Sequence, residues 1–138
     1  MKNTIKYGLI LLILGSIGGI IYYKMASKKR DPSKSNDIVY IKANDLFKLF
    51  NEYEDSANKL YLDKAINIQG EILSIENNPP RYTLYINTND SNGNISCELD
   101  SSQNQIAKNL APKQLVNITG FCNGKLIDVQ LDKCVIGK

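Results

Sequence analysis

The sequence contains no histidine and no tryptophan among its 138 residues. Without histidine, the chain alone cannot form a Ser-His-Asp triad, a Cys-His dyad, a histidine-ligated metal site or an imidazole proton shuttle. Carboxylates, lysine and cysteine remain, but no pair of carboxylates has a spacing that marks acid–base catalysis. We therefore predict that the protein is not an enzyme, and we assign no catalytic residue and no cofactor.

Cysteine is scarce, and its spacing does not indicate a metal site. Cys97, Cys122 and Cys134 form no C-x-x-C pair. The Asn-rich segment 87–94 offers oxygen ligands, but it lacks the acidic density and the distal bidentate glutamate of a calcium loop. The sequence therefore predicts no metal site.

One uncharged apolar run lies near the N-terminus. Residues 7–23 (YGLILLILGSIGGIIYY) reach the lower end of the roughly 17–25 residues that span a bilayer, and tyrosines and lysines flank them. A cleaved signal peptide fits poorly, because cleavage after Ala26 would put Lys24 where a small residue is needed. We predict an N-terminal flank at 1–6 and a single transmembrane helix at 7–23 that attaches the chain to the lipid bilayer.

The basic charge of the chain is confined to its N-terminal part. Of the 17 basic residues, six lie in the first 30 positions, which hold no acid, so residues 31–138 keep 11 bases and all 14 acids, a net charge of −3. The charges on the two sides of the apolar run are nearly balanced, with a slight lean toward a cytoplasmic domain. An acidic domain lacks the counterion-release contribution that drives most nonspecific binding to nucleic acid.

Beyond the apolar run, the composition predicts a tether and then one folded domain. Residues 26–37 hold no large apolar residue and mix Ser, Lys, Asp and Pro, so we expect a flexible tether over 24–37 and a domain over 38–138. Asn44 is a plausible N-cap for an amphipathic helix that ends near Tyr61 and is interrupted near Asp55. We expect its apolar stripe to pack on the core of the domain.

After residue 65 the hydrophobic period changes to that of strands. Apolar residues alternate within five segments, with a register slip after Gly70 and an Asn123-Gly124 turn; the segments are 65–77, 82–86, 95–99, 114–122 and 127–131. A short helix capped by Asp100-Ser101-Ser102 and ending at Leu110 separates the third and fourth segments. Three strands, a helix and two strands are the element order of an OB-fold, a mainly β, five-stranded Greek-key barrel.

A set of residues in the same region resembles the bacterial tRNA_anti-like family of OB-fold proteins. The residues that carry the resemblance are Ala43-Asn44-Asp45-Leu46, Ala57, Tyr61, Lys64, Ile68-Gln69-Gly70, Ile75, Ser96-Cys97-Glu98-Leu99, Gly120-Phe121-Cys122-Asn123-Gly124, Asp128-Val129-Gln130-Leu131 and Cys134. The resemblance covers 38–136 and implies an OB fold behind a single N-terminal membrane anchor or lipoprotein signal. It also implies a domain outside the cytoplasm, and it implies no established activity.

OB barrels usually bind their ligands on the face of the second and third strands and on the loops beside it. In this chain those places supply the candidate ligand-binding residues Asn78, Arg81, Tyr82, Tyr85, Phe121, Asn123 and Lys125. Alternation predicts that Tyr85 and Phe121 point outward and that Tyr82 points inward. Outward aromatic rings beside Arg81 and Lys125 are able to stack on bases; the alternative is that both rings pack under the N-terminal helix or serve only as strand formers.

The third and fifth strands of an OB barrel are parallel neighbours, so Cys97 and Cys134, each late in its strand, are candidates for a disulfide. The alternative is that all three cysteines are small buried apolar residues.

Taken together, these observations predict a membrane-tethered, noncatalytic OB-fold module that binds a protein or a small polar ligand. The alternative function is a nucleic-acid-binding OB-fold protein, with single-stranded DNA or a tRNA-like partner.

Overall fold

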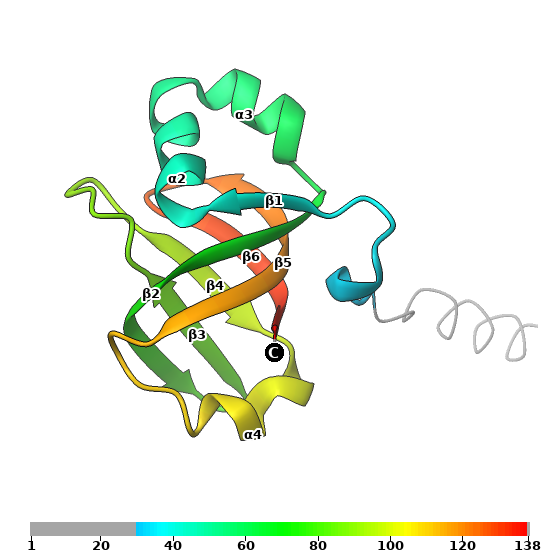
Figure 1. Cartoon of the computed structure of the whole chain (residues 1–138), viewed down its shortest axis with the longest axis vertical. Coiled ribbons are helices and arrows are strands. Elements are labelled where there is room, and N and C mark those ends of the chain that lie inside the picture. The colour runs from blue at the N-terminus through cyan, green and yellow to red at the C-terminus, as the bar shows by residue number, and fades with distance from the viewer. Residues whose placement is uncertain (1–29, 138) are drawn as a thin grey trace, which may run out of the picture. The chain divides into compact units, whose positions relative to one another are not determined.

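The computed structural model describes residues 30–137 (Figure 1). The predicted flank at 1–6, the predicted transmembrane helix at 7–23 and the first part of the predicted tether lie outside this range. Within residues 30–137, no helix combines the length and the hydropathy that a membrane-spanning segment needs.

Five strands form a closed barrel, which confirms the predicted OB fold. They are β2 (Ala65–Asn78), β3 (Arg81–Ile86), β4 (Ile95–Leu99), β5 (Leu115–Lys125) and β6 (Val129–Ile136). The strands pair in the order β2-β3-β4-β6-β5, and a further pairing of β2 with β5 closes the barrel. The β4–β6 pair is parallel, as expected for the third and fifth strands, and the other pairs within the barrel are antiparallel.

A sixth strand, β1 (Val39–Lys42), lies parallel to the first half of β2, with Val39 opposite Ile66 and Lys42 opposite Gln69. Val39 and Ile41 alternate with the exposed Tyr40 and Lys42, so the segment has the period of a strand. Four residues are too few for that period to stand out in a sequence, and the strand was not predicted.

Gly70 lies where β2 passes from one set of neighbours to another. A Cβ atom at this position would overlap Cγ2 of Ile86 and lie 3.0 Å from Cβ of Ala43. Glycine therefore lets β3 and the start of the first helix approach the same point of β2. The register shift follows shortly afterwards, between Ile72 and Ser74, close to the predicted slip.

The predicted amphipathic helix is two helices, α2 (Ala43–Glu52) and α3 (Glu54–Tyr61), which lie at one end of the barrel (Figure 1). The interruption falls at Tyr53, two residues before Asp55. The predicted N-cap is wrong, because α2 begins at Ala43 after Lys42 and no side chain caps it. The apolar face of α2 does pack on the core, through Leu46, Phe47 and Phe50, whose side chains are at most 1% exposed.

The opposite end of the barrel is covered by α4 (Asn104–Ala107), which follows the short 3-10 helix η2 (Ser101–Gln103) (Figure 1). Of the predicted capping residues Asp100-Ser101-Ser102, Asp100 caps η2, because its carboxylate accepts a hydrogen bond from the backbone N–H of Ser102. The α-helix stops at Ala107, so it is shorter than the predicted helix to Leu110.

The predicted Asn123-Gly124 turn is wrong, because both residues belong to β5. The β5–β6 register shifts between Cys122 and Lys125, and Gly124 has a φ of +88°. An Asn-Gly pair tolerates the left-handed backbone that a bulge needs as well as the one that a turn needs. The chain reverses after Lys125 instead, and Ile127, predicted to begin the last strand, is 76% exposed in the turn.

The compact unit that contains the barrel begins at Asp31, before the expected boundary at residue 38. Asp31 caps the 3-10 helix η1 (Pro32–Lys34) by accepting a hydrogen bond from the N–H of Ser33. Pro32 is buried, and η1 packs against β5, β6 and β2. The C-terminal part of the expected tether therefore belongs to the folded domain.

Candidate ligand-binding site

A hollow of about 220 Å³ lies on the outer face of β3, β4 and β6, where OB barrels usually bind their ligands. Its lining is almost entirely polar and consists of Thr83, Tyr85, Ser96, Glu98, Asn123, Gln130, Leu131 and Asp132. We refer to these eight residues as the barrel-face hollow.

Strand register brings these side chains to one face. Tyr85 lies opposite Ser96 in the β3–β4 pair, and Ser96 lies opposite Gln130 in the β4–β6 pair. The residues between them in each strand point into the core, as the buried Leu84 and Cys97 show. The hollow therefore follows from the same alternation that forms the barrel interior.

The electrostatic character of the hollow is acidic. Glu98 and Asp132 contribute two carboxylates, and no basic side chain lines it. The guanidinium of Arg81 lies beside it, with Nη1 2.7 Å from Oε1 of Glu98. The hydroxyl of Tyr85 donates a hydrogen bond to Oε2 of Glu76 at 3.1 Å, and this bond, with partial burial and the negative charge nearby, raises the pKa of Tyr85. Such a surface suits a neutral or cationic ligand better than a polyanion.

The structure brings some of the predicted ligand-binding residues together. Tyr85 and Asn123 line the hollow, as expected for outward residues of the barrel face. Asn78 and Arg81 pair at the β2–β3 turn, at one end of the face. Tyr82 is half-buried and packs against the core, as its predicted inward direction requires.

Two predicted residues lie apart from this group. Lys125 is at the other end of the strands, where its Nζ lies 5.6 Å from the centre of the Phe47 ring, so it does not share a surface with Arg81. Phe121 is half-buried in β5, opposite Ala65 of β2 and Asp132 of β6. The predicted arrangement of stacking rings between Arg81 and Lys125 is therefore not formed.

The sequence reasoning missed most of the lining, namely Thr83, Ser96, Glu98, Gln130 and Asp132. A signal was available in β4, where Ser96 and Glu98 alternate with the buried Ile95, Cys97 and Leu99. Polar residues at such positions are common on any half-exposed strand, so only the assembled register marks them as one surface.

The predicted disulfide partners lie next to one another inside the barrel. Both are free thiols in the structure, so no disulfide joins them there. Cys97 and Cys134 are fully buried, and Leu99 pairs with Cys134 in the parallel β4–β6 ladder. Burial, together with the contact with the Cys97 thiol, raises the pKa of Cys134 well above its usual range. Cys122 is buried separately, opposite Leu131, and burial raises its pKa as well.

In the part of the chain that the structure describes, no group of three or more Cys, Asp or Glu side chains is arranged to hold a metal ion.

A closed barrel of five strands in this order, with one helix between the third and fourth strands, defines an OB-fold protein. The sequence matches the tRNA_anti-like family over residues 1–136, and the chain belongs to this family. The comparison with curated proteins finds no match.

One solved structure supports the fold. A lipoprotein from Klebsiella pneumoniae subsp. pneumoniae, described as a candidate nucleic-acid-binding protein, aligns with a TM-score of 0.59 at 13% identity, over 74% of this chain and 92% of that chain. Weaker similarity extends to asparaginyl-tRNA synthetase from Pyrococcus horikoshii, with a TM-score of 0.41 at 18% identity over 56% of this chain and 20% of that chain. At these identities the likeness concerns the fold alone.

Proposed function

We propose that the protein is a membrane-tethered, noncatalytic binding module that takes a neutral or cationic ligand, a protein segment or a small polar molecule, in the barrel-face hollow. The observation that carries the proposal is the lining of this hollow, which presents two carboxylates and several uncharged hydrogen-bonding groups and no base. The noncatalytic role is consistent with a chain that has no histidine.

The membrane tether is supported by the uncharged run at 7–23, and an extracytoplasmic domain is supported by membership of the tRNA_anti-like family. Fractionation of cells that express the full chain tests both. We expect the chain to remain in the membrane pellet after alkaline carbonate extraction, and the domain to be digested by protease added to spheroplasts. Release by carbonate contradicts the tether, and digestion only after rupture of the inner membrane contradicts the orientation.

Nucleic acid is the less supported ligand. The domain carries a net charge of −3, and Arg81 beside the hollow is paired with Glu98. Nonspecific binding to single strands depends on cationic grooves, and its affinity falls steeply with salt. Tight, salt-dependent binding of oligothymidylate, weakened by Arg81→Ala or Lys125→Ala, would favour a nucleic-acid-binding function instead.

Photocross-linking in intact cells tests the use of the hollow. A photoreactive amino acid at Ser96, within the hollow, is expected to give a discrete adduct. The same residue at the exposed Lys108, beside α4 at the end of the barrel, serves as the matched control. Two results contradict a ligand in the hollow. One is an equal yield of adducts at Ser96 and Lys108, and the other is that Ser96 forms no adduct, either with a protein or with a small molecule.

A further inference from the structure

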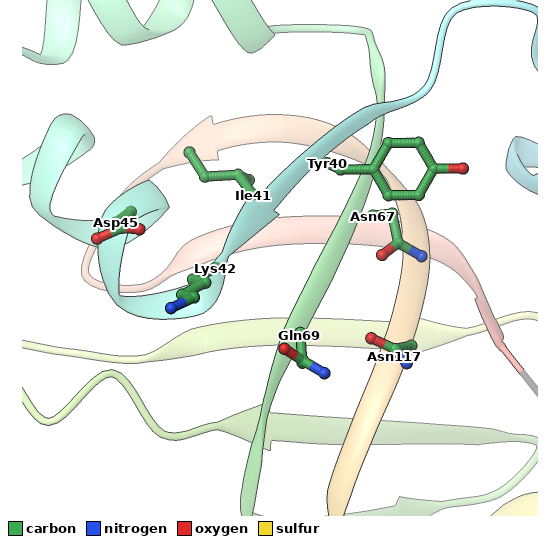
Figure 2. A pocket seen from close by; sticks show the side chains of 7 residues that line it. All are labelled: Tyr40, Ile41, Lys42, Asp45, Asn67, Gln69 and Asn117. Atoms are coloured by element: carbon green, nitrogen blue, oxygen red, sulfur yellow. The ribbon is translucent and has the colours of Figure 1, made fainter.

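A second hollow lies on a different face of the domain, formed by the outer surfaces of β1, β2 and β5 and by the first turn of α2. Its volume is about 450 Å³, and its lining consists of Tyr40, Ile41, Lys42, Asp45, Asn67, Gln69 and Asn117 (Figure 2). We call it the amide hollow, because three of these side chains are carboxamides. It shares no residue with the barrel-face hollow.

Strand register arranges the polar side chains of the amide hollow in two rows across three strands. One row runs from Tyr40 through Asn67 to Thr119, and the next runs from Lys42 through Gln69 to Asn117. Rows two residues apart in a strand are about 7 Å apart, and three strands span about 10 Å. The surface is therefore a small, two-dimensional array of hydrogen-bonding groups.

The amide of Asn67 is held in one orientation. Its Nδ2 donates a hydrogen bond to Oγ1 of Thr119 at 2.8 Å, and Thr119 is only 6% exposed. This bond engages one of the two N–H donors of Asn67, so its other N–H and its Oδ1 acceptor are left for a ligand. The side-chain amides of Gln69 and Asn117 are exposed and have no hydrogen-bond partner within residues 30–137, so each offers both donors and an acceptor.

Tyr40 adds a flat apolar wall to this array. Tyr40 is 75% exposed, and Figure 2 shows its ring next to Asn67, with Gln69 and Asn117 side by side farther from the ring. Because the ring is exposed, the burial of its apolar area contributes little to the stability of the fold. A ligand with an apolar face that covers the ring would bury this area, which would favour binding.

The charges of the hollow balance. Lys42 and Asp45 contribute one charge of each sign, and the other lining groups are neutral. A polyanion finds no basic cluster in this lining, and a simple apolar ligand leaves the amides unpaired. The groups match a molecule that has many hydroxyls, no net charge and one apolar face.

From this arrangement we infer that the amide hollow is a binding site for a neutral saccharide, whose ring stacks on Tyr40 while its hydroxyls bond to Asn67, Gln69 and Asn117. OB folds as a class accommodate oligosaccharides as well as oligonucleotides. The site goes beyond the function proposed for the barrel-face hollow, and either one stands or fails without the other.

Titration of the full chain with three uncharged trisaccharides, maltotriose, cellotriose and N,N′,N″-triacetylchitotriose, tests the inference. The chain is held in a detergent without a sugar headgroup, because such a headgroup would compete for the site. We expect at least one trisaccharide to bind saturably by calorimetry and to shift the side-chain NH₂ resonances of Gln69 and Asn117. Residues of the barrel-face hollow should not shift, which keeps this result separate from a test of the proposed function.

Variants identify the site. Tyr40→Ala is expected to weaken binding about tenfold, since it removes an aromatic stacking surface, whereas Tyr40→Phe keeps the ring and the affinity. Tyr53→Ala removes another exposed tyrosine, at the junction of α2 and α3, and is expected to leave the affinity unchanged. Asn117→Ala, at an exposed position of β5, is expected to weaken binding even if Tyr40→Ala disturbs the edge strand.

Three results overturn the inference. One is the absence of saturable binding of all three trisaccharides at millimolar concentration. The second is binding that neither Tyr40→Ala nor Asn117→Ala weakens. The third is tight binding of oligothymidylate that shifts Gln69 and Asn117, which would assign the site to nucleic acid.

Discussion

Gly120 leaves the space that the sulfur of Cys134 occupies. A Cβ atom built on Gly120 would lie 2.5 Å from Sγ of Cys134, and it would also lie 3.1 Å from the carbonyl oxygen of Asp132. Gly120 is in β5 and Cys134 is in the neighbouring β6. The buried thiol of Cys134 therefore fills the space that a side chain at position 120 would need.

Gly120→Ala is therefore expected to destabilise the fold. Overpacking of a closed core costs about 1–3 kcal/mol, and the backbone contact to Asp132 prevents easy relief. Urea unfolding followed by circular dichroism measures the change. Gly137→Ala is the control, because its nearest contact would be an ordinary 3.4 Å to Asn117; equal losses in the two variants would contradict this account.

Cys97 and Cys134 are expected to be a disulfide in protein isolated from an oxidising compartment. The two buried thiols are in contact, and their oxidation would pass two electrons and two protons to the disulfide of a thiol–disulfide oxidoreductase. Alkylation of the denatured, unreduced chain should then modify Cys122 alone, and no cysteine in the Cys122→Ser variant. Modification of all three cysteines in protein taken from the cell envelope would show that the bridge does not form.

Phe47→Ala is expected to destabilise the domain by about 3–5 kcal/mol, because Phe47 is a fully buried aromatic residue of the helical cover. The measurement is thermal or urea unfolding of the full chain. Tyr53→Ala, with a side chain that is 60% exposed, should change stability by less than about 0.5 kcal/mol. A small effect of Phe47→Ala would mean that α2 is not part of the core.

The Tyr85 hydroxyl should ionise at a higher pH than an ordinary tyrosine. The bond to Glu76 favours the protonated phenol, so the folded-state pKa lies above the unfolded value of about 10. The stability that this bond contributes is fully present below the unfolded pKa and is lost as the pH rises through the folded pKa. An NMR titration of ring-labelled tyrosine measures the shift, and Glu76→Gln should reduce it. An unchanged titration in Glu76→Gln would rule out Glu76 as the cause.

The strands of this fold were predictable because their core residues alternate regularly. Leu84 and Ile86 in β3, like Cys97 and Leu99 in β4, are all buried as their spacing indicates. In a half-exposed strand every second side chain is buried, so apolar residues alternate clearly with polar ones in the sequence. The order of the strands in the barrel then follows from the order of the elements along the chain. The register slip in β2 was visible for the same reason, since a glycine interrupts the alternation.

Other features depended on contacts that a local pattern does not contain. The Asn123-Gly124 pair has the backbone preference of a turn, and only its partner strand shows that it forms a bulge. Arg81 and Lys125 flank predicted binding loops in the sequence, yet one contacts Glu98 and the other contacts Phe47 at opposite ends of the strands. The amide hollow was missed because its carboxamides are ordinary residues of exposed strand faces until three strands align them.

The pairing of β2 with β5 has a consequence for the kinetics of folding. Partners in this pair are far apart in the chain, as Ala65 and Phe121 are at a separation of 56 residues, whereas β2 and β3 meet across a short turn. The β2–β3 hairpin can therefore form early, whereas closure of the barrel is opposed by the entropy cost of closing a long loop. Until that closure, β2 and β5 expose unpaired edges, and this interval is when the chain is most prone to associate with other copies of itself.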